Sequence, residues 1–157
     1  MNYLGKTTIH PALFYSGKIL GYLCWIVYLF MIIKINLIDG FSFDYIEYIS
    51  LIIFVIGLAL VVLSLKNLGK STRIGIPAES TILKTVGIYK FSRNPMYVGI
   101  HLWTISSIIY TQNLFILLFG IYSIIIYHLI IFGEERFLEN RFNEEYNNYK
   151  MLVRRYL

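Results

Sequence analysis

The chain has 157 residues, of which 57% are hydrophobic and 15% charged, and its mean hydropathy is +0.64. These values exclude an ordinary soluble domain and indicate an integral membrane protein. The formal net charge is +5, but the basic residues flank apolar runs instead of forming a basic arm, so we expect no nucleic-acid partner. The single cysteine, Cys24, lies in an apolar run and excludes an intrachain disulfide.

Two long apolar runs fill the first part of the chain. Residues 16–38 predict a membrane span with Lys18 and Lys34 near its ends, where long side chains can place their ammonium groups among lipid headgroups. A short acidic link at 39–44 follows, and residues 45–68 predict a second span. Each run is long enough to cross a hydrocarbon core of about 30 Å.

The longest polar segment, residues 67–94, carries five basic residues against one acid, Glu79. The positive-inside rule predicts that this segment and both termini lie on the cytoplasmic side. Its glycines and Pro77 predict irregular chain with one short turn over 79–85.

A helical hairpin is predicted next. Pro95 suits the first position of a helix, where its missing N–H is not needed. We expect a third span over 96–110, a turn at 111–113, and a fourth span over 114–132 that ends at Gly133.

Apolar residues in the last segment recur at steps of three and four, from Leu138 to Tyr156. This spacing predicts an amphipathic cytosolic helix over 134–157 that docks on the bundle or the lipid surface, or acts as a lid. The predicted fold is an all-α membrane bundle of about four transmembrane helices plus this helix. We expect one domain, with two spans in 16–68 and the catalytic loop, hairpin and C-terminal helix in 69–157.

Polar residues precede the third span and follow the fourth, so the hairpin brings them to the same end. Arg93, Asn94 and Tyr97 are thereby predicted to face Glu134 and Glu135. An arginine and two carboxylates at a bilayer edge can be interfacial anchors, and tyrosines there can form an aromatic belt. The alternative is a polar site at the membrane surface.

Two histidines, His101 and His128, lie within predicted spans, and His101 follows Tyr97 by one helical turn and shares its face. The histidines can be polar packing residues, a wall of a cofactor pocket or metal ligands. A metal site needs a third ligand nearby, and no spacing of Cys or His supplies a recognisable set, so we expect no metal. Glycine-rich nucleotide motifs and a nucleophile elbow are also missing from the sequence.

The motif residues resemble a known superfamily. The pattern is Leu83-x3-Gly87-x-Tyr89-x3-Arg93-Asn94-Pro95-Met96-Tyr97-x-Gly99, then a hairpin, then Glu134-Glu135-x2-Leu138 and Phe142-x3-Tyr146-x2-Tyr149. In this order and spacing it is similar to the integral-membrane methyltransferases of the isoprenylcysteine carboxyl methyltransferase and phospholipid methyltransferase superfamily. The resemblance covers about residues 68–157, and the first two spans match only in being hydrophobic.

The resemblance implies a helical fold without a Rossmann domain that binds S-adenosylmethionine at the cytosolic membrane edge. The implied catalytic residues are Arg93 and Glu135. The implied cofactor-binding residues are Leu83, Gly87, Tyr89, Asn94, Pro95, Tyr97, His101 and Glu134. Enzymes acting on isoprenylcysteine have His between the Arg and Pro, where this chain has Asn94, which forms hydrogen bonds but does not titrate.

We expect methyl transfer to a lipid-like acceptor from the bilayer, with O-methylation of a carboxylate preferred because Arg93 can bind one by a bidentate fork. N-methylation of a phospholipid amine is an alternative in which Glu134 or Glu135 acts as base. A steroid-reductase-like enzyme that uses NADPH, and a non-enzymatic scaffold, are the other hypotheses. The 69–94 loop has few grouped cations for the phosphates of NADPH.

Overall fold

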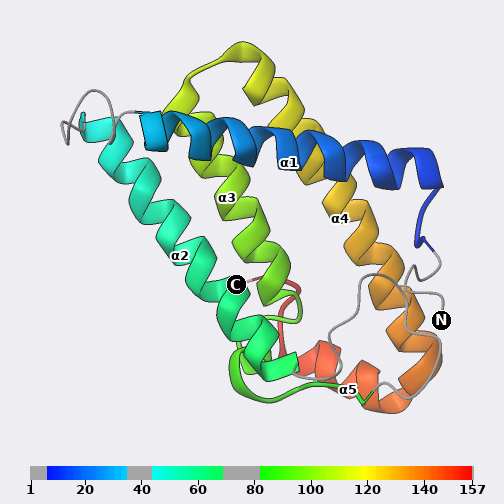
Figure 1. The fold of residues 1–157 in the computed structure, drawn as a ribbon. Helices are drawn as coiled ribbons and strands as arrows, with labels where there is room; N and C mark the ends of the chain where they lie inside the picture. Colours follow the sequence, from blue (N-terminus) through cyan, green and yellow to red (C-terminus); the bar gives the residue numbers. More distant parts are fainter. Residues whose placement is uncertain (1–6, 35–43, 69–81, 157) are drawn as a thin grey trace.

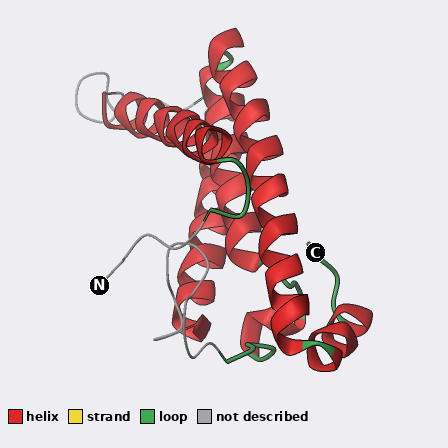
Figure 2. Cartoon of the chain, turned by 90° about the vertical axis from the view of Figure 1, so that its right-hand side faces the viewer, coloured by secondary structure: helices red, strands yellow, loops and turns green. Residues whose placement is uncertain are grey.

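The computed structural model describes residues 7–34, 44–68 and 82–156, which form an all-helical bundle (Figure 1). The elements are α1 (Pro11–Lys34), α2 (Tyr45–Leu68), the 3₁₀ helix η3 (Gly87–Lys90), α3 (Pro95–Thr111), α4 (Leu114–Phe142) and α5 (Glu144–Leu152). The helices α2, α3 and α4 are roughly aligned, and α1 crosses α3 and α4 at a steep angle (Figure 2). The predicted all-α bundle is confirmed.

Three of these helices, α1, α2 and α4, are long and apolar enough to cross a membrane. The predicted third span, α3, has 17 residues and is therefore about 26 Å long at 1.5 Å per residue. It packs against α1, α2 and α4, and its buried side carries small and polar residues such as Thr104, Ser106 and Ser107. This chain is an integral membrane protein in which the shortest of the four long helices is the central one.

The first helix begins at Pro11, five residues before the predicted start of the first span at residue 16. Proline occupies the first helical position, and the carbonyl of His10 accepts a hydrogen bond from the Phe14 N–H at 3.0 Å. Phe14 is only 7% exposed, so the added turn is fixed by packing. The end of the predicted first span at 35–38, most of the acidic link at 39–44 and residues 69–81 of the 67–94 segment lie outside the described residues.

Small residues allow the helices to pack closely where hydrocarbon surrounds them. Lipid tails are as apolar as leucine, so helix association in a membrane depends on close packing and on hydrogen bonds. A Cβ atom on Gly99 of α3 would lie 2.6 Å from the Gly57 carbonyl oxygen of α2, and Ser106 donates to the Ser50 carbonyl at 2.7 Å. The contact between α2 and α3 therefore depends on glycine and serine.

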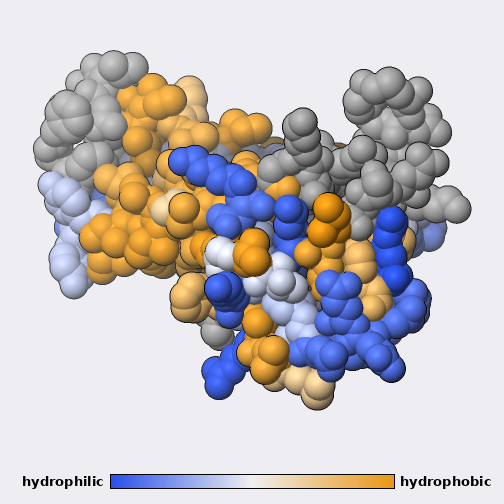
Figure 3. All heavy atoms as spheres, turned by 90° about the horizontal axis from the view of Figure 1, so that it is seen from below, coloured by the Kyte–Doolittle hydropathy of each residue, from blue (hydrophilic) through white to orange (hydrophobic). Residues whose placement is uncertain are grey.

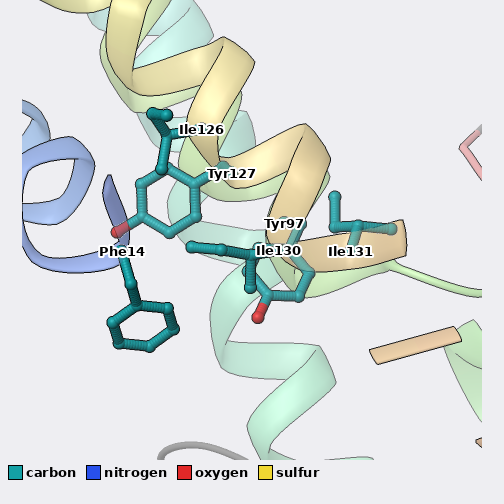
Figure 4. Packing of buried hydrophobic residues seen from close by; sticks show 6 residues of the cluster. All are labelled: Phe14, Tyr97, Ile126, Tyr127, Ile130 and Ile131. Carbon is teal, nitrogen blue, oxygen red and sulfur yellow. The ribbon is translucent and has the colours of Figure 1, made fainter. Parts of the chain in front are cut away.

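The contact between α1 and α4 follows the same rule. A Cβ on Gly17 would lie 2.3 Å from the Ile126 side chain, and Ser123 donates to the Gly17 carbonyl at 2.9 Å. Figure 4 shows side chains from α1, α3 and α4 gathered in one apolar cluster. Its buried members are Phe14, Tyr97, Ile126, Tyr127, Ile130 and Ile131.

The turn between α3 and α4 agrees with the predicted hairpin. Gln112 closes α3 with a left-handed backbone, φ 43°, and the Asn113 side chain accepts hydrogen bonds from the N–H groups of Phe115 and Ile116. This cap satisfies the first free donors of α4. The hairpin consequently places the start of α3 and the end of α4 at the same end of the bundle (Figure 1).

The prediction that Gly133 ends the fourth span is wrong, because α4 continues to Phe142. A Cβ on Gly133 would lie 2.4 Å from Thr8, so this glycine makes room for the N-terminal segment within a continuous helix. The predicted single helix over 134–157 is also wrong. The helix breaks at Asn143, φ 44°, and α5 ends at Leu152, after which Val153 is extended.

The end of the bundle that holds α5 is the polar end. Figure 3 looks at the molecule from this side and shows hydrophilic side chains gathered there, next to hydrophobic surface that belongs to the spans. Side chains such as Ile26, Phe30 and Ile52 are more than half exposed on the spans, as expected for groups that face lipid. The predicted site residues all belong to the segment before η3, η3 itself, the turn at 91–94, α3 and α4.

Candidate active site

Arg93 stands just before α3 and contacts Glu135 on α4. Its Nε donates to Glu135 Oε1 at 3.1 Å and its Nη2 to Oε2 at 3.3 Å, the bidentate geometry of a strong arginine–carboxylate pair. The two side chains are 9% and 6% exposed. The juxtaposition expected from the hairpin is therefore present, and it is a buried ion pair.

Two further groups complete the surroundings of Glu135. The Asn94 Nδ2 donates to Oε1 at 2.9 Å, and Arg155 binds Oε2 through Nε at 3.0 Å and Nη2 at 2.9 Å. Asn94 precedes α3 but makes no side-chain cap, because its amide is turned toward the carboxylate. One carboxylate thus binds two guanidinium groups and an amide, and Glu135 stays ionised among them.

The backbone of the chain end is held by the same residues. Residues 153–156, which we name the C-terminal strap, follow α5 and return to the start of α3. Arg93 Nη1 donates to the Val153 carbonyl at 2.6 Å, and the Arg93 N–H donates to the Arg154 carbonyl at 2.9 Å. Ser92 Oγ and Asn94 Nδ2 both donate to the Arg155 carbonyl. The segment 92–94 therefore binds the strap as well as Glu135.

Glu134 faces a different side of α4. Its Oε1 accepts a 2.7 Å hydrogen bond from the hydroxyl of Tyr97, a residue of the apolar cluster. Lys18 of α1 acts on Glu134 electrostatically, and its ammonium lies 4.1 Å from the centre of the Phe14 ring. Among the described residues, no lysine or arginine forms an ion pair with Glu134 within 4.0 Å, which leaves this carboxylate able to accept a further donor.

The segment before α3 is fixed by Gly87 and Tyr89. Gly87 has φ 64°, and a Cβ there would lie 1.6 Å from Asn67 Oδ1, so only glycine fits. The Tyr149 hydroxyl of α5 donates to the Tyr89 carbonyl at 2.6 Å. Burial raises the pKa of Tyr149 to about 12, so its hydroxyl remains a donor at neutral pH. Leu83 is half-buried in the segment that leads to η3.

His101 lies deeper, one turn along α3 from Tyr97. Its ring lies edge-on to Tyr127 and to Tyr156, with ring centres 6.3 and 6.1 Å away, and its Nδ1 is buried with no partner in the described part of the chain. Tyr156 also contacts His128, whose Nδ1 is hydrogen bonded to the Tyr156 hydroxyl. Tyr156 thus contacts two histidines, one from each helix of the hairpin.

The structure brings most predicted site residues together at the polar end. Arg93, Asn94 and Glu135 form one cluster, and Tyr97 and Glu134 form a second one beside it. Pro95 is buried as the first residue of α3, and Tyr89 is buried in η3. Gly87 is the first residue of η3, and Leu83 lies in the segment before it.

Sequence reasoning missed three residues that belong to these clusters, namely Ser92, Arg155 and Tyr156, and it considered His128 only as a second histidine within a span. Tyr156 and Arg155 were assigned to one continuous helix, in which the chain end points away from α3. The only signal for Arg155 and Tyr156 was the combination of apolar and basic residues at the end of the chain. Within the described ranges, no group of three or more His, Cys, Asp or Glu side chains could hold a metal ion.

A polar site at the end of a membrane helical hairpin, with no metal ligands, can bind a polar cofactor and exclude water from it. A family model described as phospholipid methyltransferase matches residues 46–145. No curated protein and no solved structure matches the chain. The family match starts within α2, earlier than the motif resemblance, and covers well over half of the chain. The chain belongs to the phospholipid methyltransferase family, within the superfamily of membrane methyltransferases that its motifs resemble.

Proposed function

We propose that this protein transfers a methyl group from S-adenosylmethionine to the headgroup of a lipid-like molecule in the membrane. The observation that carries the proposal is Glu134. It is a carboxylate at the polar end of the hairpin, in a methyltransferase family, and among the described residues its hydrogen-bond donor is Tyr97. The ammonium of S-adenosylmethionine is a cation that such a carboxylate binds.

The residues present fit this cofactor. The buried Nδ1 of His101 has no partner among the described residues, and the rings of Tyr97 and Tyr127 lie nearby. Flat aromatic rings suit an adenine base or a sulfonium, and an unpaired ring nitrogen suits a polar edge. When bound, the cofactor supplies an electrophilic methyl group on a positively charged sulfur. Glu134, Tyr97 and His101 would orient it.

The contacts of Arg93 and Arg155 bear on the choice between a carboxylate and an amine as the methyl acceptor. A carboxylate acceptor would need a cation, and the sequence pointed to Arg93 for this role. Arg93 and Arg155 instead both bind Glu135, and a carboxylate acceptor would have to displace it. We therefore favour an amine headgroup. The amine would lose one proton to bulk water before it enters the site. Its lone pair could then accept the methyl group that the bound cofactor would supply, and S-adenosylhomocysteine would be the leaving product.

Exclusion of water is the other contribution of the protein. Attack by a neutral amine on a sulfonium moves charge without creating a new ion, so holding the two partners in line in a dry site gives much of the rate. The apolar cluster around Tyr97, Tyr127 and Ile130 lies directly beside Glu134. We propose that it forms the dry wall of the site.

The test uses the purified protein in lipid vesicles with methyl-labelled S-adenosylmethionine. One set of vesicles contains a lipid with a primary amine headgroup, and a matched set contains a lipid with a free carboxylate. We expect label to enter the amine lipid, and S-adenosylhomocysteine to raise the melting temperature while NADPH does not. Stabilisation by NADPH alone would favour a reductase, and no effect of either ligand would favour a scaffold. Label in the carboxylate lipid alone would overturn the amine assignment.

A further inference from the structure

Arg93 has little capacity left for a ligand. All three guanidinium nitrogens donate to groups of this chain: Nε and Nη2 to Glu135, and Nη1 to the carbonyls of Val153 and Lys150. The Arg93 side chain is 9% exposed. A ligand carboxylate could bind this guanidinium only by displacing Glu135 or the strap.

The contacts of Arg93 fix the direction of the strap. Its N–H binds the Arg154 carbonyl at 2.9 Å, and the next carbonyl, that of Arg155, accepts from Ser92 Oγ at 3.2 Å and Asn94 Nδ2 at 3.3 Å. Three consecutive carbonyls of the strap, residues 153–155, are thus bound by three consecutive residues, 92–94. This is a specific backbone clamp in a chain segment that has no helix or strand of its own.

The residue that this clamp positions is Tyr156. Its ring is stacked on His128 of α4, with an interplanar angle of 26°, and lies edge-on to His101 of α3. Tyr156 also packs against the apolar cluster that contains Tyr97. The strap therefore places an aromatic side chain next to the buried, unpartnered Nδ1 of His101.

We propose that the C-terminal strap is one wall of the cofactor site, that Tyr156 contacts the bound cofactor, and that Arg93 is a positioning residue acting through the strap. This inference rests on the proposed function. A flat base with ring acceptors and an amino donor, such as adenine, can stack on an aromatic ring and bond to a free imidazole nitrogen. Tyr156 and His101 offer both groups side by side.

The experiment measures the dissociation constant of S-adenosylhomocysteine for the purified full-length protein and three variants. These are Tyr156→Ala, Arg93→Gln and the double variant. Tyr156→Ala should weaken binding by about tenfold, which corresponds to about 1.4 kcal/mol and is the size expected for the loss of one aromatic contact. If Arg93 acts by placing Tyr156, the double variant should bind no worse than Arg93→Gln alone. Tyr45→Ala, which removes a 75% exposed tyrosine, is the matched control and should bind normally.

Two results would overturn the inference. Additive losses in the double variant would mean that Arg93 acts independently of Tyr156, and unchanged or tighter binding by Tyr156→Ala would mean that Tyr156 only covers the site. Failure of the proposed function is a separate outcome, in which the unaltered protein binds no S-adenosylhomocysteine.

A second measurement keeps the test decisive if Arg93→Gln does not fold. Hydrogen exchange of the unaltered protein should show slower exchange of the amides in residues 153–156 when S-adenosylhomocysteine is added. Equal exchange with and without the ligand, in a protein that binds it, would contradict a wall formed by the strap.

Discussion

Glu134 and Glu135 are neighbours on α4 with opposite surroundings. Glu135 binds two arginines and an asparagine, and its side chain is 6% exposed. Glu134 accepts one tyrosine hydroxyl and borders an apolar cluster. A carboxylate whose hydrogen-bonding capacity is filled by its own chain contributes to architecture, whereas one with capacity left can meet a ligand. On this comparison we propose that the Glu-Glu motif has a structural half, Glu135, and a binding half, Glu134.

The same division applies to the residues before α3. Arg93 and Asn94 point to the Glu135 side and hold the strap, while Tyr97 points to the Glu134 side. A turn at the start of one helix thereby supplies both halves. Polar interactions are stronger in a site from which water is excluded, so the contacts of Glu135 with Arg93 and Asn94 hold the start of α3 firmly. The position of Tyr97, and with it the binding half, depends on that geometry.

Among the substitutions that test this comparison, Glu135→Gln should cause the largest loss of stability. The change leaves the buried Arg93 guanidinium next to that of Arg155 without a counter-charge, and loss of one partner of a buried ion pair costs about 3–5 kcal/mol. Chemical unfolding of the purified protein in detergent should show this loss. A variant as stable as the unaltered protein would contradict the structural role of Glu135.

Glu134→Gln should separate binding from stability. The amide can still accept the Tyr97 hydroxyl, so we expect the free energy of unfolding to change by less than about 1 kcal/mol. The dissociation constant of S-adenosylhomocysteine should rise about tenfold or more, because a charge-assisted contact becomes a neutral one. Calorimetry on the same preparation measures both. If the variant instead loses as much stability as Glu135→Gln, the two carboxylates are not distinct.

Tyr149→Phe tests the hydrogen bond between α5 and η3, which holds the segment that leads to Arg93. It removes the hydroxyl that donates to the Tyr89 carbonyl at 2.6 Å and leaves that buried carbonyl without this donor, at a cost of about 1 kcal/mol. Thermal unfolding should show a small decrease in melting temperature. Tyr45→Phe, at a tyrosine that is 75% exposed, is the control and should show none.

The smallest effect is expected from Glu139→Gln. Glu139 pairs with Lys150 at 3.1 Å, but the two side chains are 40% and 33% exposed. Ion pairs in contact with water contribute about 0.5 kcal/mol or less. A loss comparable to that of Glu135→Gln would show that exposure does not distinguish the ion pairs at this end.

The hairpin part of the site could be predicted from the sequence. Pro95 marks the start of α3, and a short turn at 111–113 requires α4 to run antiparallel, so Arg93 and Glu135 must lie at one end. Gly87 was also identified by its motif, and its backbone at φ 64° supplies the physical reason for a glycine there. These features depend on local signals and helix length alone.

The chain end could not be predicted in this way. Steps of three and four residues continue through Asn143, so the pattern gives no sign that the helix breaks there, and the return of Arg155 and Tyr156 depends on that break. Gly133 gave a false stop signal because a glycine required for packing and one that ends a helix look the same in a sequence. The steep crossing of α1 was equally hidden, since its apolar residues surround the helix.

Asn143 joins α4 to α5 with φ 44° and ψ −114°, a conformation that a residue with a side chain adopts only at a cost of about 1–3 kcal/mol. If this residue were helical, α4 and α5 would form one rod. At 1.5 Å per residue, Leu152 at its end would then lie about 26 Å from Glu135, and the strap that follows would start from there. The backbone conformation of one residue, Asn143, therefore allows Arg155 to return to Glu135, and the proposed site depends on this turn.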